Sequence, residues 1–214
     1  SKTEHHAVLE TCQFLNKQGY DITCVDVDQY GMVDPEAVKK AITPLTGLIS
    51  VMYVNNEVGT INPVGEIGTI ARNHGIVFHT DAVQAFGKLR LHVDELGADL
   101  LTISAHKIYG PKGIGALYIR KGTAIDNFIH GGGQERGRRA GTENVPLAAG
   151  FAEAAKRMIF NRESEWGRMN KLRNLFRKNI EDHFPFVVFN GHPADSLPHI
   201  VNISFDSGKV DIDG

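Results

Sequence analysis

The sequence predicts an α/β fold with a mostly parallel sheet. Short apolar stretches of strand type alternate with stretches of helical periodicity from Ala7 to Arg120, and this alternation is typical of parallel sheets. The stretch Leu48–Val54 is apolar except for Ser50, as expected of a strand that is covered on both faces. The pattern changes near residue 162, which predicts a large domain over residues 1–162 and the beginning of a small α+β domain over residues 163–214.

The first three elements are predicted from periodicity and from a helix start. Apolar residues at helical spacing predict a helix over residues 7–15. The alternating, β-branched stretch from Tyr20 to Val27 predicts a strand. Asp34 is suited to a helix N-cap and precedes Pro35, which is favoured at the first helical position, so we expect a short helix through Ala41.

Further strands and a helix are predicted next. The strand Leu48–Val54 leads into a helix over residues 64–73, and buried strands follow over residues 76–80 and 99–104. Another strand, over residues 115–120, comes after a short turn that contains glycine and proline. Because parallel neighbours need a long crossover, this short connection predicts that the strand is antiparallel.

A glycine-rich loop, a long helical stretch and two short strands complete the pattern. The loop over residues 131–141 has no strand before it, so it lacks the context of a dinucleotide-binding motif and is interpreted as a surface loop or a dimer contact. Amphipathic periodicity runs over residues 146–183, with an expected break near residues 166–167. Strands are predicted over residues 186–189 and 199–205.

Composition narrows the classes of function. The chain has 214 residues, 42% of them hydrophobic, and a formal net charge of -2, which gives no general attraction to nucleic acid or to an anionic membrane. No apolar stretch approaches the ~20 residues that span a bilayer, so we expect a cytoplasmic protein, or one of the mitochondrial matrix in a eukaryote. Cys12 and Cys24 are expected to be buried thiols, and His74 and His79 to be structural, because none of them has the spacing of a metal site.

Polar residues of chemically useful types follow three of the predicted strands. They supply amide, carboxylate, hydroxyl, imidazole and amine groups. Because the carboxyl ends of parallel strands meet at the edge of the sheet where ligands bind, we expect these groups to converge there. The residues are Asn56 after the first of these strands, Asp81 and Gln84 after the second, and Ser104, His106 and Lys107 after the third.

This combination of groups predicts a site for pyridoxal phosphate. A lysine at the end of a strand can be partly desolvated, lose its proton and form a Schiff base with an aldehyde, and we assign this role to Lys107. Once displaced by the substrate amine, the same lysine can act as the base at Cα. A carboxylate keeps the pyridine nitrogen of the cofactor protonated, and Asp81 is predicted to supply it.

The other polar residues are predicted to hold the cofactor in place. Gln84 and Asn56 are expected to hydrogen-bond its phenolic oxygen, and Ser104 and His106 its phosphate. Plainer interpretations exist for single residues, because an aspartate can cap a helix and the pair at residues 55–56 can form a turn. The joint occurrence of all these residues at successive strand ends favours the cofactor site.

Five segments of the sequence resemble the NifS/IscS-type cysteine desulfurases, which belong to the class-V aminotransferases. The segments are Thr3–His5, Tyr53–Gly59, His79–Gln84, Ser104–Gly113 and Gly131–Thr142, and the resemblance covers nearly the whole chain. It implies the aspartate aminotransferase-like fold of pyridoxal phosphate enzymes (fold type I) and a homodimer. It also implies conversion of L-cysteine to L-alanine, with the sulfur passed as a persulfide to an iron–sulfur scaffold or another sulfur-acceptor protein.

The resemblance implies roles for two further residues and a gap in the site. His5 resembles the histidine that stacks on the cofactor ring and carries protons, and Thr142 resembles the threonine that reaches the phosphate of the neighbouring subunit. The upstream phosphate-binding loop, the arginine for the substrate carboxylate and the nucleophilic cysteine have no counterpart, since neither Cys12 nor Cys24 lies at the cysteine's position. The chain is therefore interpreted as the middle part of such an enzyme, incomplete at both ends and unable to complete sulfur transfer alone.

Two other functions remain open at this point. A selenocysteine lyase, or another lyase or transaminase of the same fold, would share most of the surroundings of Lys107, although the extended loop after Gly131 favours the desulfurase. A non-catalytic, dimerising partner in iron–sulfur assembly is a candidate of a different class. The presence of Asp81, His106 and Lys107 argues against a protein that has lost its cofactor.

Overall fold

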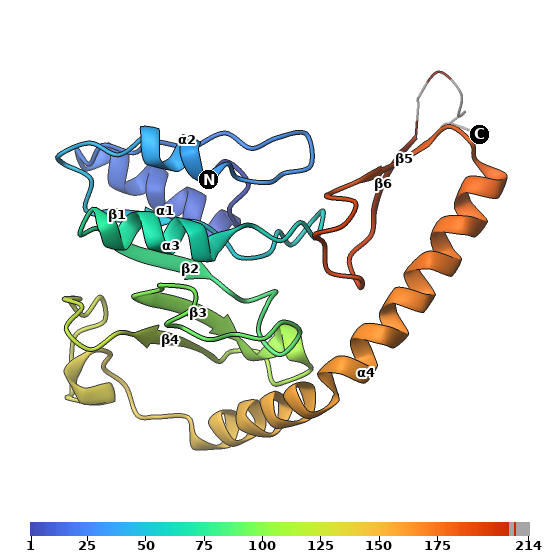
Figure 1. The fold of residues 1–214 in the computed structure, drawn as a ribbon. Helices are drawn as coiled ribbons and strands as arrows, with labels where there is room; N and C mark the ends of the chain where they lie inside the picture. Colours follow the sequence, from blue (N-terminus) through green and yellow to red (C-terminus); the bar gives the residue numbers. More distant parts are fainter. Residues whose placement is uncertain (206–207, 209–214) are drawn as a thin grey trace.

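The computed structural model describes residues 1–205 and residue 208 (Figure 1). Its main sheet has the strand order β1-β2-β3-β4, and a separate two-stranded sheet joins β5 and β6. The pairs β1–β2 and β2–β3 are parallel, whereas β4 runs antiparallel to β3. These findings confirm the predicted α/β class, the mostly parallel sheet and the antiparallel strand after the short turn.

The strands of the main sheet are short and leave the polar residues at one edge. Parallel pairing of β2 with β3 places Asp81, the last residue of β2, beside Thr102. The strands are β1 (Leu48–Ser50), β2 (Val77–Asp81), β3 (Leu100–Ser104) and β4 (Gly115–Ile119).

The second helix begins where its capping residue predicts. The Asp34 side chain accepts a hydrogen bond from the Glu36 N–H at 2.9 Å and starts the second helix, as expected from the sequence. The α-helices are α1 (His6–Lys17), α2 (Pro35–Lys40), α3 (Val64–Asn73) and α4 (Val145–His183), and the 3-10 turns are η1 (Ala105–Ile108) and η2 (Glu135–Gly137).

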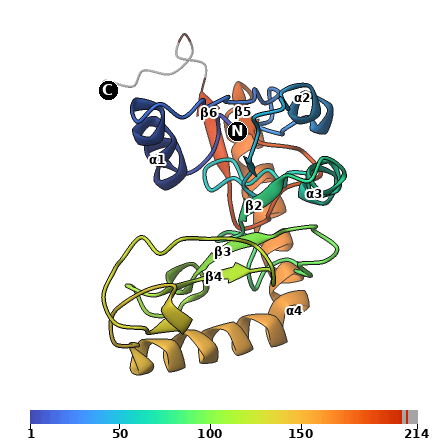
Figure 2. The same cartoon turned by 90° about the vertical axis from the view of Figure 1, so that its left-hand side faces the viewer.

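Helix α3 connects β1 to β2 and covers the sheet. Its residues Val64, Ile67 and Ala71 are almost completely buried and belong to the main core together with Phe78 of β2. Figure 2 shows α1 and α3 on opposite sides of β2. The helical spacing of these apolar positions is what the sequence predicts for a helix that packs on a sheet.

The strand predicted over residues 20–27 does not form. Val27 makes one antiparallel bridge with Val33, and the carbonyl oxygen of Val25 accepts a hydrogen bond from the Lys2 N–H at 3.0 Å. A strand needs a neighbour along several residues, and the described sheet provides none here. Val25 and Val27 nevertheless pack against the main core, which explains the alternating apolar pattern.

Strand β1 ends at Ser50, earlier than predicted. Beyond it the backbone still follows β2, because the Val51 N–H donates to the carbonyl oxygen of His79 at 3.2 Å and the Tyr53 N–H donates to that of Asp81 at 2.9 Å. The apolar run therefore lies along the sheet over its whole length, although only its first part forms a regular strand.

Helix α4 is continuous over 39 residues, so the break predicted near residues 166–167 is wrong. A Cβ added at Gly167 would meet nothing within 4 Å, which shows that this glycine lies on an open helix face. A glycine inside a helix costs only about 1 kcal/mol relative to alanine, which a long helix tolerates.

The boundary predicted at residue 162 falls within α4, and the division into two domains stays a prediction. No helix in residues 1–205, α4 included, is both long and apolar enough to cross a membrane.

Two buried apolar clusters hold the sheet and its helices together. The main core lies around the sheet and includes Phe78 and Leu197, both fully buried. The second cluster joins η1 to the first part of α4 through Ala105, Ile108 and Phe151. Lys107 therefore stands on a turn whose inner side is packed against a helix.

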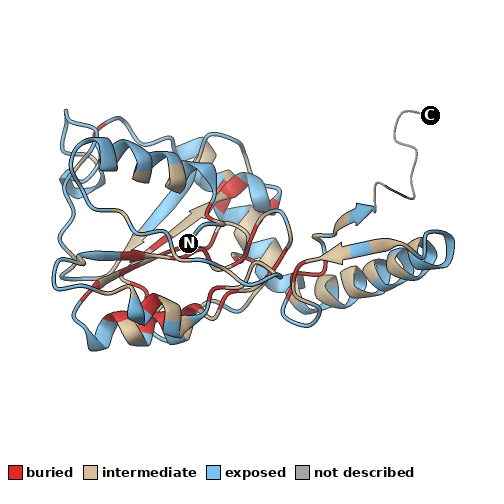
Figure 3. Ribbon diagram, turned by 90° about the horizontal axis from the view of Figure 1, so that it is seen from above, coloured by how far each residue is buried: buried red, intermediate tan, exposed pale blue. Residues whose placement is uncertain are grey.

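The far half of α4 and the β5–β6 hairpin form a less buried extension. The hairpin consists of β5 (Val187–Asn190) and β6 (Asn202–Phe205), which confirms two predicted strands with a shorter second one. Figure 3 shows buried residues concentrated in the body around the main sheet and few along this extension. Three edge-to-face rings, Phe184, Phe186 and Phe205, pack together at its end.

The two cysteines are more exposed than predicted. Cys24 is exposed and Cys12 is partly exposed, so the expectation of two buried thiols is wrong. Cys12 lies on α1, a helix with no buried residue, and Cys24 lies in the segment that lacks a strand partner. Partial burial, and next the proximity of Cys24, raise the pKa of the Cys12 thiol.

Candidate active site

The carboxyl ends of β2 and β3 bring the predicted residues to one edge of the main sheet. Asp81 is the last residue of β2 and Ser104 the last of β3, two neighbouring parallel strands. The hydrogen bond from the Tyr53 N–H to the Asp81 carbonyl oxygen brings the turn at residues 55–56 to the same edge. The predicted convergence is thus found for the residues that follow these three stretches.

Lys107 lies in η1, which follows β3 directly. Ala105 and Ile108 take the two inner positions of this turn and are fully buried, whereas His106 and Lys107 are exposed. The structure of this chain shows no burial of the Lys107 side chain, and its partial desolvation stays a prediction. The turn directs its side chain to solvent, because the inner side is occupied by apolar residues that pack on α4.

The residues that end η1 fix its backbone. Tyr109 has a left-handed conformation with a φ of 63°, which is uncommon for a residue other than glycine and marks local strain. A Cβ at Gly110 would lie 2.9 Å from the carbonyl oxygen of Ala105 and 3.2 Å from the Cβ of Ala154. Only glycine allows this close approach of the turn to α4.

Ser104 and His106 form a pair. The Ser104 Oγ and the His106 Nδ1 are 2.7 Å apart and share a hydrogen bond. In the described residues the His106 Nε2 has no protein partner, so it is open to a ligand. When the Ser104 hydroxyl donates to Nδ1, the Nε2–H of His106 can donate to a phosphate oxygen, and when Nδ1–H donates to Oγ, the Ser104 hydroxyl can do so instead.

Asp81 closes a turn rather than capping a helix. Its Oδ1 accepts a hydrogen bond from the Val83 N–H at 2.9 Å, and residues 83–88 form turns instead of a helix. The helix-cap interpretation is therefore wrong. No described hydrogen bond engages Oδ2, which leaves this oxygen available to a cationic or protonated group.

Gln84 contacts a residue that the sequence did not single out. The Nζ of Lys88 donates to the backbone carbonyl oxygen of Gln84 at 3.1 Å and to its side-chain Oε1 at 3.4 Å. Burial, and next the positive charge of Lys107, lower the pKa of Lys88 to about 8. A lone lysine after a glycine has no pattern that distinguishes it from a surface lysine, so sequence reasoning could not find it.

At residues 55–56 the two asparagines differ. Asn55 is buried, and its Oδ1 accepts hydrogen bonds from the N–H groups of Glu57 and Val58 at 2.9 Å each, which confirms the turn interpretation for this residue. Its Nδ2 also donates to the carbonyl oxygen of Thr3 at 3.0 Å. Asn56 is partly exposed, and no described hydrogen bond occupies its side chain.

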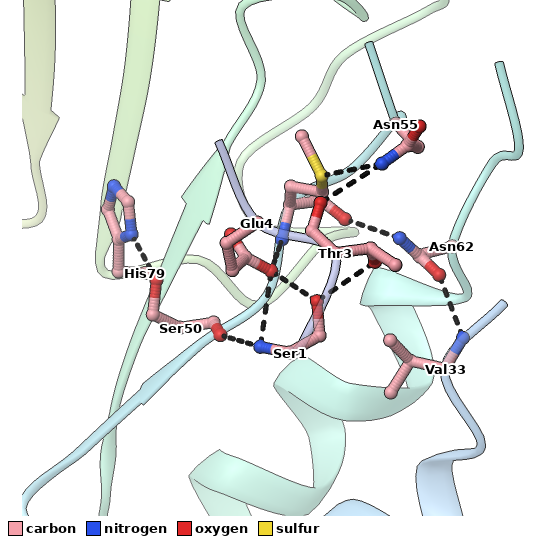
Figure 4. Close-up of polar contacts among 9 residues, drawn as sticks. Ser1, Thr3, Glu4, Val33, Ser50, Asn55, Asn62 and His79 are labelled. Carbon is pink, nitrogen blue, oxygen red and sulfur yellow. Dashed lines mark hydrogen bonds and ion pairs between the residues drawn. The ribbon is translucent and has the colours of Figure 1, made fainter. Parts of the chain in front are cut away.

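The segment before α1 is tied to the end of β1 (Figure 4). Glu4 is only 6% exposed, and its Oε1 accepts hydrogen bonds from the Met52 N–H at 2.8 Å and from the Ser1 hydroxyl at 2.7 Å. Sequence reasoning missed Glu4, although it lies in one of the segments that carry the family resemblance. Its buried carboxylate holds the residues on either side of it against the sheet.

His5 is the N-cap of α1. Its Nδ1 accepts a hydrogen bond from the Ala7 N–H at 3.1 Å, and the ring is exposed. Because Nδ1 acts as an acceptor, Nε2 is the ring nitrogen that can exchange a proton with a ligand.

Thr142 lies apart from the other predicted residues. It is exposed at the end of the glycine-rich loop, where the Gly141 N–H donates to the Gln134 Oε1 at 3.1 Å. No described contact connects Thr142 to Lys107 or to the turn after β2. The structure of one chain does not bring this residue into the group.

His79 and His74 are structural, as predicted. The Nδ1 of His79 is 2.8 Å from the Ser50 Oγ (Figure 4), and its Nε2 is 2.9 Å from the Thr102 Oγ1. Burial lowers the pKa of His79, so its ring is neutral at pH 7 and bridges β1, β2 and β3. His74 bonds the Ile70 carbonyl oxygen within its own helix end. Over residues 1–205, no three His, Cys, Asp or Glu side chains gather as a metal ion would require.

A cavity lies elsewhere in the described chain. It has a volume of about 890 Å³, and its lining includes Asp28, Asp34, Tyr53 and Glu66 but none of the predicted site residues. The lining contains neither an amine nor an imidazole. We therefore locate the candidate site at the sheet edge, because the reactive groups lie there.

A parallel sheet whose carboxyl edge carries a lysine, a carboxylate and a serine–histidine pair has the layout of the fold type I pyridoxal phosphate enzymes. The chain matches the family model of the class-V aminotransferases over residues 1–212 and belongs to this family. Membership implies pyridoxal phosphate as the cofactor.

Curated relatives narrow the similarity to cysteine desulfurases. The chain is 52% identical over 205 residues to the cysteine desulfurase IscS of Dictyoglomus turgidum, which covers 96% of this chain and 52% of that protein. It is 48% identical over 206 residues to the cysteine desulfurase IscS of Methanosarcina thermophila, with 96% and 51% covered. The chain thus spans about half the length of the curated relatives it matches.

Solved structures agree with this assignment. A NifS-like protein has a TM-score of 0.91 at 40% identity, with 95% of this chain and 56% of that chain covered. DndA from Streptomyces lividans has a TM-score of 0.91 at 34% identity, with 99% and 60% covered. SspA in complex with cysteine has a TM-score of 0.86 at 38% identity, with 96% and 57% covered. The predicted resemblance and the predicted fold type are confirmed.

Proposed function

We propose that this chain is the cofactor-binding part of a pyridoxal phosphate-dependent cysteine desulfurase. The whole enzyme would convert L-cysteine to L-alanine and pass the sulfur, as a persulfide, to an acceptor for iron–sulfur cluster or thio-cofactor synthesis. One observation carries the proposal: Lys107 stands exposed directly after β3, with the Ser104–His106 pair before it and Asp81 at the end of the neighbouring strand. Similarity to cysteine desulfurases over 96% of the chain supports it.

The groups at the sheet edge fit pyridoxal phosphate. The cofactor needs an amine for its aldehyde, a carboxylate for its pyridine nitrogen and donors for its phosphate, and the edge offers Lys107, the free oxygen of Asp81 and the Ser104–His106 pair. When bound, the cofactor supplies an electron sink for negative charge at the substrate Cα. Gln84 and Asn56 would hydrogen-bond the phenolic oxygen.

Lys107 and His5 would move protons. The Lys107 side chain is exposed on a turn of fixed backbone, so its Nζ would be available to hold the cofactor and to take a proton from the substrate Cα. His5 would stack on the cofactor ring and exchange a proton through Nε2, because its Nδ1 accepts the hydrogen bond of the Ala7 N–H.

Substrate and partners are proposed from the relatives and from the surface. The similarity to SspA, solved in complex with cysteine, supports L-cysteine as the substrate. Phe128 and Phe160 are 95% and 87% exposed, which favours a partner surface that covers them, and we propose a homodimer in which Thr142 reaches the phosphate of the neighbouring subunit. The sulfur acceptor would be an iron–sulfur scaffold or another acceptor protein, in the cytoplasm.

Cofactor uptake tests the proposal. The chain is mixed with pyridoxal phosphate, its visible absorption is recorded, and the bound cofactor is fixed with borohydride and located by peptide mass spectrometry. We expect the cofactor on Lys107, none in Lys107→Ala, and unchanged uptake in Lys121→Ala, which removes another exposed lysine. No cofactor on Lys107, or equal uptake by Lys107→Ala, would contradict the assignment.

Product analysis tests the reaction. In the whole protein we expect alanine and sulfide from L-cysteine in the presence of a reductant, and no persulfide on Cys12 or Cys24 by alkylation and mass spectrometry. Alanine release from selenocysteine alone would favour the selenocysteine lyase. Cofactor uptake without either product would favour another lyase or transaminase of this fold, and no uptake at all would favour the non-catalytic partner.

A further inference from the structure

Lys88 has an unusual position for a lysine. It ends the turns after β2, where Gly87 approaches Ile108 of η1 and Met158 of α4 so closely that a Cβ would lie 3.3 Å and 3.0 Å from their side chains. Phe86, two residues before Lys88, packs against the second cluster, which also carries η1. The turn after β2 and the turn that bears Lys107 thus both pack against the second cluster.

The charges around Lys88 are of its own sign. Burial, and next the positive charge of Lys107, lower the pKa of Lys88 to about 8. The pKa of His199, an exposed residue, is lowered first by partial desolvation and next by the positive charge of Lys88. Among the described residues, Lys88 makes no ion pair with a carboxylate. A half-buried ammonium without a counter-charge is unfavourable, so its retained contacts with Gln84 are the interactions that stabilise it.

These contacts restrict the carboxamide of Gln84. The Lys88 Nζ reaches the backbone carbonyl oxygen of Gln84 at 3.1 Å and its Oε1 at 3.4 Å, so one ammonium bridges the main chain and the side chain of the same residue. A carboxamide presents an acceptor on one side and two donors on the other. With Oε1 directed at Lys88, the Nε2 donors are directed away from it.

We propose that Lys88 is a positioning residue that orients the Gln84 carboxamide so that its Nε2 donor faces the cofactor. This inference rests on the proposed function, in which Gln84 hydrogen-bonds the phenolic oxygen. An oxygen that carries negative charge requires a donor, and a carboxamide that is free to flip would present its own oxygen for part of the time. Lys88 acts only through Gln84 and touches neither substrate nor cofactor.

The first test uses the chain without cofactor. Side-chain amide resonances are recorded by ¹⁵N NMR, and that of Gln84 is assigned by its loss in Gln84→Ala. We expect Lys88→Met, which keeps the apolar stem, to shift this resonance and to increase its fast motion, while Lys88→Arg, which keeps charge and donors, retains the restriction. Lys112→Met, at an exposed lysine in the turn after η1, should leave it unchanged. An unchanged Gln84 resonance in Lys88→Met would overturn the proposal.

The second test is a double-mutant cycle on the loaded protein. The apparent Kd for pyridoxal phosphate and the pH midpoint of its visible absorption are measured for Lys88→Met, Gln84→Ala and the double variant. We expect Lys88→Met to weaken binding by about tenfold and to shift the midpoint, in line with the loss of one oriented hydrogen bond. The double variant should be no weaker than Gln84→Ala alone, because Lys88 acts through Gln84. Independent, additive effects would overturn the proposal.

The two tests separate this inference from the proposed function. If the unmodified chain takes up no cofactor, the proposed function fails and the inference fails with it. If cofactor binds at Lys107 but the cycle is additive, only the role of Lys88 is overturned. If Lys88→Met does not fold, as judged by circular dichroism, Lys88→Arg and Lys88→Gln enter the same cycle, and a Lys88→Gln variant with an unshifted midpoint overturns the proposal.

Discussion

The turns after β2 and β3 each carry a lysine, and the two lysines have opposite surroundings. Lys107 is exposed on a turn whose buried positions are taken by alanine and isoleucine. Lys88 is half-buried without a carboxylate partner in the described chain, and its ammonium is bound by Gln84. In this chain the exposed lysine, Lys107, is the one assigned to the cofactor. The half-buried lysine, Lys88, has the lowered pKa and is assigned to orienting Gln84.

The largest expected effect is on where the cofactor is fixed when one of the two lysines is replaced. In Lys107→Ala, cofactor fixed by borohydride should be absent and should not move to Lys88, because the Lys88 amine is held by Gln84. In Lys88→Met, fixation at Lys107 should persist. Peptide mass spectrometry of the fixed protein measures both. Cofactor found on Lys88 in either protein would reverse the assignment.

The next largest effect is expected at the end of β2. Asp81→Asn keeps an acceptor for the Val83 N–H but removes the charge that would hold a proton on the pyridine nitrogen. The exchange of the L-alanine Cα proton with deuterium, catalysed by the loaded protein, should slow by about 10²–10³-fold. The free energy of unfolding should change by less than about 0.5 kcal/mol. Equal exchange rates in both proteins would place the pairing carboxylate elsewhere.

The third prediction concerns the pH dependence of the free energy of unfolding, to which Lys88 should contribute through its lowered pKa. The Lys88 pKa of about 8 lies below its ordinary value of 10.5. Between these values the unfolded chain binds a proton that the folded chain does not, so the free energy of unfolding rises with pH across this window. Relative to Lys88→Met, the rise should be about 1 to 3 kcal/mol, the lower end reflecting partial exposure. Urea unfolding from pH 7 to pH 10.5 measures it.

The matched control for this measurement is Lys112→Met, which removes an exposed lysine. This variant should follow the unmodified chain across the whole pH range. The difference in free energy of unfolding between the unmodified chain and Lys88→Met should rise between pH 8 and pH 10.5. A difference that stays constant or falls over this range would contradict the desolvation of Lys88.

The smallest effect concerns the backbone that carries Lys107. Gly110→Ala would bring a Cβ to 2.9 Å from the Ala105 carbonyl oxygen, and it should lower the free energy of unfolding by about 1 to 3 kcal/mol. Gly167→Ala, whose Cβ meets no atom within 4 Å on α4, should instead raise it by about 0.5 to 1 kcal/mol. Chemical unfolding compares the two. A stabilised Gly110→Ala variant would show that η1 does not approach α4 so closely.

Much of the fold could be predicted because its signals are local. The Asp34–Pro35 helix start, the apolar strands and the short turn before β4 all gave the correct elements. The errors depend on partners that a sequence does not reveal. Residues 20–27 alternate like a strand because Val25 and Val27 pack on the core, yet they have no neighbouring strand in the described structure.

The candidate site divides in the same way. Asp81, Ser104, His106 and Lys107 could be found because polar residues directly after a strand are a local signal. The role of Lys88 depends on a contact across a turn and on the packing of Gly87 against α4, and the exposure of Lys107 depends on which residues of η1 face that helix. Neither contact is encoded in the spacing of the residues.

Helix α4 connects the second cluster to the hairpin. At 1.5 Å per residue, its 39 residues follow a path of about 58 Å, from the cluster beneath η1 to the hairpin. Along this path Trp166 packs against the main core, and the Arg173 Nη1 donates to the Ser196 Oγ at 3.2 Å. The turn that holds Lys107 and the hairpin are therefore attached to one continuous helix that is itself fastened to the body between them.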